Sequence, residues 1–314
     1  MNKKLAIFLE FVEIRTKVAS VFPMMIGFMW SAYYYGTFNW LNAALFFIAV
    51  VTFDMCTTAI NNAMDYHKAV DLDYKVNENV IGVHQLSFQR MVGVILTLLG
   101  ISLVFSLILV ILTDSLLLGM GAICFVIGIC YTFGPMPLSR LPLGEVFSGF
   151  TMGFGILFLA IYMTQYGNLL TSAWSLNEVV IRFNWVESLR IFVWSTPLIS
   201  LIANIMLANN TCDLKTDIQN QRYTLVYYIG VQRAIRLYQI LSAIPWLVWG
   251  LLIATRHLPL WAGLGFLLII PHTKSVQRYS AKQIKRETFV ESVKSFVMFA
   301  MMYVLTLLIA LITK

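Results

Sequence analysis

The chain has 314 residues, of which 59% are apolar and only 12% charged, and the apolar residues run in long blocks. This composition excludes an ordinary soluble domain and is typical of a protein that crosses a membrane several times. The net charge of +7 indicates membrane topology rather than a nucleic-acid partner, and no nucleic acid is expected.

The N-terminal stretch "MNKKLAIFLEFVEIRTK" begins with basic residues, but Glu10 and Glu13 interrupt the apolar core that a signal peptide needs. We expect an amphipathic helix at the membrane interface instead. Hydropathy then predicts about nine membrane helices and an all-α integral membrane fold in one domain, residues 1–314. The predicted spans are 18–36, 41–60, 91–112, 114–133, 143–166, 189–208, 234–254, 258–273 and 293–312.

Basic residues are distributed unevenly over the connections between these spans. With a cytoplasmic N-terminus, the inner connections carry most of the 22 Lys and Arg residues. The outer side keeps only Arg182, Arg190, Arg256 and Lys314. By the positive-inside rule, the N-terminus and the long polar connections lie in the cytoplasm and the C-terminus lies outside. The expected location is the plasma membrane, with lipid around the helices.

Polar residues gather where the second span ends, in "AINNAMDYHKAVDLD". Asn61 and Asp65 are four residues apart and therefore share one helix face, which Asp54 extends back into the membrane. Asp71 and Asp73 follow, and each is a candidate metal ligand, a candidate base, or a solvated loop residue.

The connection after the fourth span reads "YTFGPMPLSRLPLGEVF". Its prolines and glycines interrupt the helices, and Tyr131, Arg140 and Glu145 supply polar groups at the same face. The segment is either a structured loop beside the polar cluster or an ordinary turn between helices.

A second polar cluster, Asn209, Asp213 and Asp217, lies at the end of the sixth span with the same spacing of four, 148 residues after the first. The matched positions predict a faint repeat of about 15–166 and 189–290, giving a bundle of four helices, four helices and one. If the two halves pack around a common axis, the two clusters face each other.

Carboxylate and amide oxygens without paired Cys or His ligands favour Mg²⁺ or Ca²⁺ over zinc. Mg²⁺ is typically held by one or two carboxylates together with substrate phosphates. Lys68, Lys215 and Arg222 lie close by in the sequence and suit the remaining phosphate oxygens. The pattern therefore indicates a diphosphate ester clamped between two half-sites.

Other interpretations stay open for single clusters, because an Asn or Asp at a helix end is often a cap or a solvated residue. An EF-hand in "DLDYKVNENVIG" is excluded, since Lys75 replaces a ligand, Val76 replaces the required Gly and Gly82 replaces the final Glu. The four cysteines show no C-x-x-C spacing and are expected to be packing residues.

These motifs resemble those of the UbiA superfamily of intramembrane aromatic prenyltransferases. That family has two Asp-rich motifs at the cytoplasmic ends of helices two and six of a nine-helix bundle. Within it, the chain is most similar to the 1,4-dihydroxy-2-naphthoate polyprenyltransferases of menaquinone synthesis. The loop "YTFGPMPL" resembles that branch's Y-T-x-G-P-x-P. The residues that match the two Asp-rich motifs are Asn61, Asp65, Tyr66, Lys68 and Asp71, and then Asn209, Asn210, Asp213, Asp217, Arg222, Thr224 and Leu225. The chain departs from the branch where Asn62 replaces an Asp, Lys215 replaces an acid, and Arg222-Tyr223 replaces Lys-Arg.

The resemblance implies Mg²⁺-dependent transfer of a polyprenyl group from an allylic diphosphate to an aromatic acceptor such as dihydroxynaphthoate. It assigns Mg²⁺ to Asn61, Asp65, Asp71, Asn209, Asp213 and Asp217, with Asp65, Asp71, Asp213 and Asp217 as the catalytic carboxylates. From the position of the residues themselves, we expect Lys68, Lys215, Arg222 and Arg140 to bind the diphosphate, and Tyr131, Asp54 and Glu145 to belong to the acceptor site or its cavity. Acceptors of the benzoate, homogentisate or haem type are alternatives, and a secondary transporter of an anionic metabolite is an alternative of another class.

Overall fold

The computed structural model describes residues 3–69, 72–133 and 137–314, so the predicted ligand Asp71 lies outside the described residues. Elements marked η are short turns of 3₁₀ or π helix. The first half consists of α1 (Lys3–Phe11), η1 (Ile14–Lys17), α2 (Val18–Trp30), η2 (Ser31–Tyr35), α3 (Trp40–Lys68), η3 (Tyr74–Glu78), α4 (Val80–Val83), α5 (Phe88–Leu112), α6 (Leu116–Thr132), η4 (Leu138–Arg140), α7 (Gly144–Ser148), η5 (Gly149–Gly155) and α8 (Ile156–Leu169). The second half consists of β1 (Leu170–Trp174), β2 (Val179–Phe183), α9 (Trp185–Cys212), α10 (Leu214–Gln219), α11 (Leu225–Ile229), α12 (Val231–Ala254), η6 (Leu260–Leu268), α13 (Ile269–Ala281) and α14 (Phe289–Ile312).

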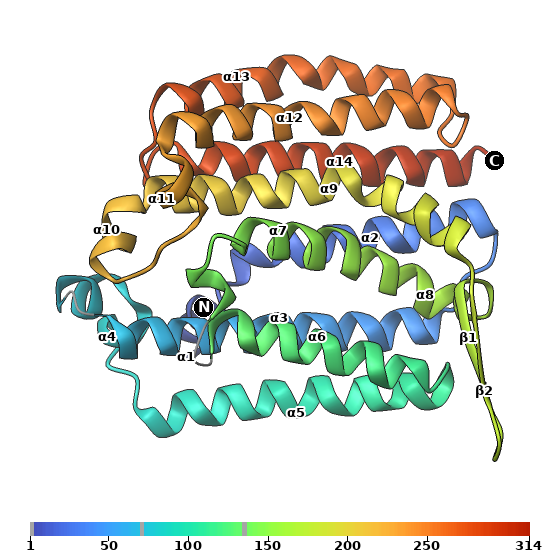
Figure 1. The fold of residues 1–314 in the computed structure, drawn as a ribbon, viewed down its shortest axis with the longest axis horizontal. Helices are drawn as coiled ribbons and strands as arrows, with labels where there is room; N and C mark the ends of the chain where they lie inside the picture. Colours follow the sequence, from blue (N-terminus) through green and yellow to red (C-terminus); the bar gives the residue numbers. More distant parts are fainter. Residues whose placement is uncertain (1–2, 70–71, 134–136) are drawn as a thin grey trace.

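The long helices run side by side along the long axis of the molecule (Figure 1). The principal neighbours are α3 with α5, α9 with α12, and α2 with α8, while α14 packs against both α2 and α9. The ends of α3 and α9 that carry the two polar clusters lie at one end of the bundle, near α4 and α10. The C-terminus and the β1–β2 hairpin lie at the opposite end (Figure 1).

Six helices of the described chain are long and apolar enough to cross a membrane. They are Trp40–Lys68, Phe88–Leu112, Gly144–Leu169, Trp185–Cys212, Val231–Ala254 and Phe289–Ile312. A shorter apolar helix covers Leu116–Tyr131. The predicted spans 18–36 and 258–273 fall on segments divided into α2 and η2, and into η6 and α13. The expected multi-pass helical fold is therefore confirmed, whereas the count of nine spans and their 4+4+1 arrangement stay predictions.

Local sequence explains where the two helices with the polar clusters begin. The side chain of Asn39 caps α3 by accepting from the backbone N–H of Asn42 at 3.0 Å. Asn184 caps α9 by accepting from the backbone N–H of Glu187 at 3.2 Å. Such caps satisfy amide groups that have no partner within the helix. Because no Gly or Pro follows its start, α3 continues past the predicted end at residue 60 to Lys68.

Stacked aromatic side chains fix the centre of the bundle. Trp30 of α2 lies parallel to Trp194 of α9, with 4.0 Å between ring centroids. The indole N–H of Trp30 donates to the Tyr303 hydroxyl of α14 at 2.8 Å, and that hydroxyl donates to the carbonyl of Trp194 at 3.1 Å. All three side chains are fully buried. This contact ties together three helices that are distant in the sequence.

Two glycines bring the α7–η5 segment against α9. A Cβ at Gly149 would lie 2.7 Å from the carbonyl oxygen of Ile199, and one at Gly153 would lie 2.6 Å from the Ile199 nitrogen. Small residues four apart allow this close approach of two helices in a membrane. The contact places Glu145, one turn before Gly149, beside the end of α9.

The connection 170–183 forms an antiparallel hairpin that the sequence analysis did not anticipate. Leu170 pairs with Phe183, and Trp174 pairs with Val179 at the turn. The carboxylate of Asp114, in the α5–α6 turn, accepts from the backbone N–H of Ser172 at 2.7 Å and from its hydroxyl at 2.6 Å. One acidic residue thus ties the hairpin to the helical bundle.

Candidate active site

The first polar cluster lies on the last turns of α3, as the spacing predicts. Asn61 and Asp65 both lie within the helix, and Asp65 is half-buried. Its carboxylate interacts electrostatically with Arg222, Arg140 and Lys68. Two of these three cations come from other connections, so the end of α3 faces residues from the centre and the second half of the chain.

The second polar cluster is divided between two helices. Asn209 lies in the last turn of α9, Asp213 ends that helix, and Asp217 belongs to the separate helix α10. The helix boundary at Asp213 therefore falls inside the cluster. The N–H of Asp217 still donates to the carbonyl of Asp213 at 2.8 Å, so one helical turn separates the two carboxylates.

Asp217 is the most deeply buried carboxylate of this cluster, with 5% of its surface exposed. Its Oδ1 lies 3.5 Å from Nε of Arg222, and within the described chain its Oδ2 has no hydrogen-bond partner. Burial raises the pKa of Asp217 to about 6, although the positive charge of Arg222 opposes the shift. A buried carboxylate oxygen without a donor is suited to accept a cation.

Arg140 connects the two clusters. It ends η4, and its charge interacts with both Asp65 and Asp217 and also with Arg222. Burial and the neighbouring Arg222 lower the pKa of Arg140 from its ordinary value. Two guanidinium groups side by side repel each other, and the two carboxylates only partly compensate. A ligand that carries several negative charges would fit this arrangement.

The loop before α7 contributes a second layer of polar contacts. Oε1 of Glu145 accepts from Nδ2 of Asn210 at 2.9 Å, which holds the end of α9 against α7. Oε2 of Glu145 and Oδ1 of Asn210 are buried, and no described residue hydrogen-bonds to either. The Tyr131 hydroxyl, at the end of α6, lies 3.7 Å from the sulfur of Met206. Glu145 and Arg222 both act electrostatically on this hydroxyl.

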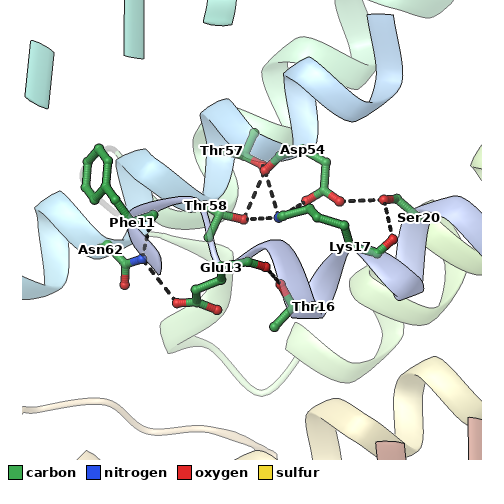
Figure 2. Close-up of polar contacts among 9 residues, drawn as sticks. All are labelled: Phe11, Glu13, Thr16, Lys17, Ser20, Asp54, Thr57, Thr58 and Asn62. Atoms are coloured by element: carbon green, nitrogen blue, oxygen red, sulfur yellow. Dashed lines mark hydrogen bonds and ion pairs between the residues drawn. The ribbon is translucent and has the colours of Figure 1, made fainter. Parts of the chain in front are cut away.

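Asp54 has partners of its own, outside this group (Figure 2). Oδ1 accepts from the Lys17 ammonium at 2.7 Å, and Oδ2 accepts from the Ser20 hydroxyl at 2.5 Å. Lys17 also donates to the Thr58 hydroxyl at 2.6 Å. A buried carboxylate is stabilised by such a paired cation. The ion pair links the N-terminal segment to α3, and it gives Asp54 a structural role that the sequence analysis missed.

Lys285 is a further residue that the sequence analysis did not assign to the site. It lies between α13 and α14, and its ammonium donates to Oδ1 of Asn209 and to Oδ2 of Asp213. The only sequence signal was its membership of a basic inner connection. By contrast, the predicted diphosphate ligand Lys215 is exposed on α10.

The donors at this end of the bundle fit a hard divalent ion. No three His, Cys, Asp or Glu side chains of the described chain form a metal-binding group on their own. The amide and carboxylate oxygens of both clusters, including the unpaired Oδ2 of Asp217, suit Mg²⁺ when phosphate oxygens complete the coordination. Such a site is assembled together with its substrate.

An apolar hollow of about 310 Å³ adjoins the first cluster. Its lining comes from α3, α5, α6 and the residue after α6, and comprises Ile60, Ala63, Met64, Ile95, Ile129 and Phe133. A charged cluster at the end of a membrane bundle and an apolar hollow beside it are the two surfaces that an amphiphilic substrate requires. Fold and site together define a multi-pass helical membrane protein that gathers carboxylates and cations at one end of its bundle.

Comparison with known proteins identifies the class more closely. The chain belongs to the UbiA prenyltransferase family, whose model matches residues 20–300. It is therefore a prenyltransferase, and the resemblance seen in the motifs is confirmed.

Two similar proteins are both named 1,4-dihydroxy-2-naphthoate octaprenyltransferase. The one from Bacillus subtilis (strain 168) is 24% identical over 266 residues, covering 84% of this chain and 79% of that protein. The one from Mycobacterium tuberculosis (strain ATCC 25618 / H37Rv) is 26% identical over 258 residues, covering 75% and 82%. A solved structure of a UbiA homolog from Archaeoglobus fulgidus, bound to GPP and Mg²⁺, has the same fold, with a TM-score of 0.67. It is 12% identical and covers 97% of this chain and 99% of its own.

Proposed function

We propose that the protein transfers a polyprenyl group from an allylic diphosphate to 1,4-dihydroxy-2-naphthoate, with Mg²⁺ as cofactor, and yields the hydroquinone form of a demethylmenaquinone. The observation that carries the proposal is that the two motifs come close enough for the charges of Asp65 from the first and Asp217 from the second both to act on Arg140. The names of the similar proteins support the naphthoate acceptor. The archaeal homolog bound to GPP and Mg²⁺ supports the donor and the metal.

The proposed diphosphate site uses cations that lie within or near the two motifs. Asn61, Asp65 and Asp71 on one side, and Asn209, Asp213 and Asp217 on the other, would hold the metal. When bound, Mg²⁺ supplies positive charge against the charge that grows on the departing diphosphate. Lys68, Lys215, Arg140 and Arg222 bind the remaining oxygens and stabilise that charge more strongly in the transition state than in the ground state.

The bond changes follow from this arrangement. The carbon–oxygen bond of the allylic diphosphate breaks, and its electron pair leaves with the diphosphate. The ring carbon that carries the carboxylate then forms a bond to the allylic carbon, and the carboxylate departs as CO₂. Tyr131 and Glu145 would bound the acceptor side of the site, and Asp71 is the candidate base for a ring hydroxyl. The apolar hollow beside α3 supports binding of the apolar prenyl tail.

A matrix of donors and acceptors tests the proposal on detergent-purified protein. Naphthoate, benzoate and homogentisate acceptors are combined with geranyl, farnesyl and longer diphosphates, with Mg²⁺ or with a chelator, and products are identified by mass. We expect prenylated naphthoate that has lost CO₂, formed only with Mg²⁺ and without any membrane gradient. Prenylation of benzoates alone would overturn the acceptor. No turnover of any donor would overturn the whole proposal.

Asp65→Asn and Asp213→Asn test the two half-sites in the same assay. Each is expected to lower kcat/KM by about 100-fold or more, because even indirect partners of a metal are worth about 10- to 100-fold. Glu287→Gln is the matched control, since this exposed acid at the same end pairs with Lys282 at 3.3 Å. Full activity in either Asp variant would contradict the metal assignment.

A further inference from the structure

Lys285 binds side-chain oxygens of two residues that are proposed above as metal ligands of the second motif. Its ammonium donates to Asn209 and to Asp213, which lie 76 and 72 residues earlier in the chain. The side chain also lies over the ring of Phe289, with 5.0 Å between Nζ and the ring centroid. The Lys285 side chain is 44% exposed and that of Asp213 28%, so solutes have access to the pair.

The connection that presents Lys285 is a closed turn. The Thr288 hydroxyl donates to the carbonyl of Lys282 at 2.7 Å and accepts from the N–H of Ile284 at 2.9 Å. The N–H of Thr288 donates to the carbonyl of Ile284 at 2.8 Å. Gln283 donates to the carbonyl of Tyr279 at 2.7 Å and so caps the end of α13. These bonds fix the backbone on both sides of Lys285, so the turn determines the point from which the Lys285 side chain extends.

We propose that the Lys285 ammonium binds Asn209 and Asp213 in the absence of substrate. When a metal ion binds these two residues, the ammonium moves to the oxygens of the diphosphate. This inference rests on the proposed function. A divalent ion and an ammonium cannot share the same two oxygens, because their charges repel at such short range. Metal binding therefore displaces Lys285, and the displaced ammonium lies beside the diphosphate oxygens that arrive with the metal. Lys285 makes binding of the two ligands cooperative, since the diphosphate compensates for the lost Asn209 and Asp213 contacts.

Calorimetric titration of detergent-purified protein with Mn²⁺ and with inorganic pyrophosphate, without prenyl transfer, tests this role. In the Lys285→Met variant we expect Mn²⁺ alone to bind about tenfold more tightly. Pyrophosphate in the presence of Mn²⁺ should bind about tenfold more weakly, as expected for the loss of a hydrogen bond to a charged group. With pyrophosphate alone binding as in the parent protein, the coupling between the two ligands should therefore fall by about tenfold, because the coupling is the ratio of the pyrophosphate affinities with and without Mn²⁺.

Three variants complete the experiment. Lys285→Arg keeps the charge and should retain the coupling, whereas Lys285→Gln should behave as Lys285→Met does and replaces it if that variant does not fold. Lys282→Met is the matched control, because Lys282 lies on the same turn and pairs with Glu287. Unchanged affinities in both neutral Lys285 variants, while the parent protein binds both ligands, would overturn the role of Lys285 alone. Failure of the parent protein to bind either ligand would overturn the proposed function itself.

Discussion

Asn62 stands where the first motif of this family usually has an Asp, and its contacts give a physical reason. Its Nδ2 donates to the carbonyl of Phe11 at 3.0 Å and to Oε1 of Glu13 at 3.1 Å (Figure 2). Glu13 has a left-handed backbone with φ of 48°, a conformation that costs energy for a residue with a side chain. The side-chain amide of Asn62 therefore stabilises the strained turn before η1. A carboxylate at this position has no N–H group and could not donate either hydrogen bond.

Asn62→Asp is accordingly expected to destabilise the protein without increasing prenyl transfer. The loss of two hydrogen bonds and the new repulsion from Glu13 should lower the free energy of unfolding by about 1–3 kcal/mol. Denaturant titration in detergent measures this change. The double variant Asn62→Asp/Glu13→Gln should recover most of the loss, because the amide introduced at position 13 offers an N–H to the carboxylate introduced at position 62. Higher activity with undiminished stability in Asn62→Asp would show instead that the position is an unused metal ligand.

Single residues also show which parts of the site a sequence reveals. Asn61 and Asp65, and likewise Asn209 and Asp213, were identifiable because residues four apart on a helix share a face and hydropathy locates the helix ends. The partnership of Lys285 with Asn209 and Asp213 was not, since it depends on a turn closed by Thr288 and on packing across 72 to 76 residues. The Lys17–Asp54 ion pair was missed because nothing in local spacing connects two residues 37 apart.

Among the elements, the β1–β2 hairpin depends on one carboxylate in a neighbouring turn. Asp114 accepts two hydrogen bonds from Ser172 and one from the N–H of Leu116 at 2.9 Å. Burial alone would raise the pKa of Asp114, but these hydrogen bonds outweigh it and lower the pKa below its ordinary value of 3.8. The hairpin register was not predictable from sequence, because its turn is held by hydrogen bonds between Ser175 and Glu178.

Removal of the Asp114 carboxylate should loosen the hairpin and leave the bundle intact. In Asp114→Ala we expect hydrogen exchange of the β1 amides to accelerate by about tenfold, the equivalent of one hydrogen bond to a charged group. Because the folded pKa is lowered, the stabilisation is present above the ordinary pKa and is lost as pH falls through the folded pKa. Exchange corrected for intrinsic rates should therefore accelerate at low pH in the parent protein but not in the variant. Glu178→Gln is the control. Equal protection of the β1 amides from exchange in all three proteins would show that the Asp114 carboxylate does not stabilise the hairpin.

At the scale of the whole molecule, hydropathy predicted the multi-pass helical fold but not the divided segments. α2 gives way to a π-helical turn at Ser31, and α13 follows the 3₁₀ segment Leu260–Leu268, so neither is a single uninterrupted α-helix. The paired position of the motifs was predictable from their equal spacing. The close approach of α7 and Glu145 to α9 was not predictable, because it depends on packing at Gly149 and Gly153. The faint sequence repeat indicates that the ends of α3 and α9 have equivalent positions in the two halves of the chain. The distance between these ends is determined by the packing of the helices.

The orientation of the bundle in the membrane is the remaining prediction at this scale. The charge distribution predicts that the motif end lies in the cytoplasm and the hairpin outside. In a background without the native cysteines, Leu176→Cys at the fully exposed hairpin turn and Lys282→Cys at the motif end report the two sides. A membrane-impermeant maleimide should label the first variant in intact cells and the second only after permeabilisation. The reverse pattern would invert the topology. It would also mean that the prenyl diphosphate is bound from outside, because Lys282 and Lys285 share one turn and every cation proposed to bind the diphosphate lies at that end of the bundle.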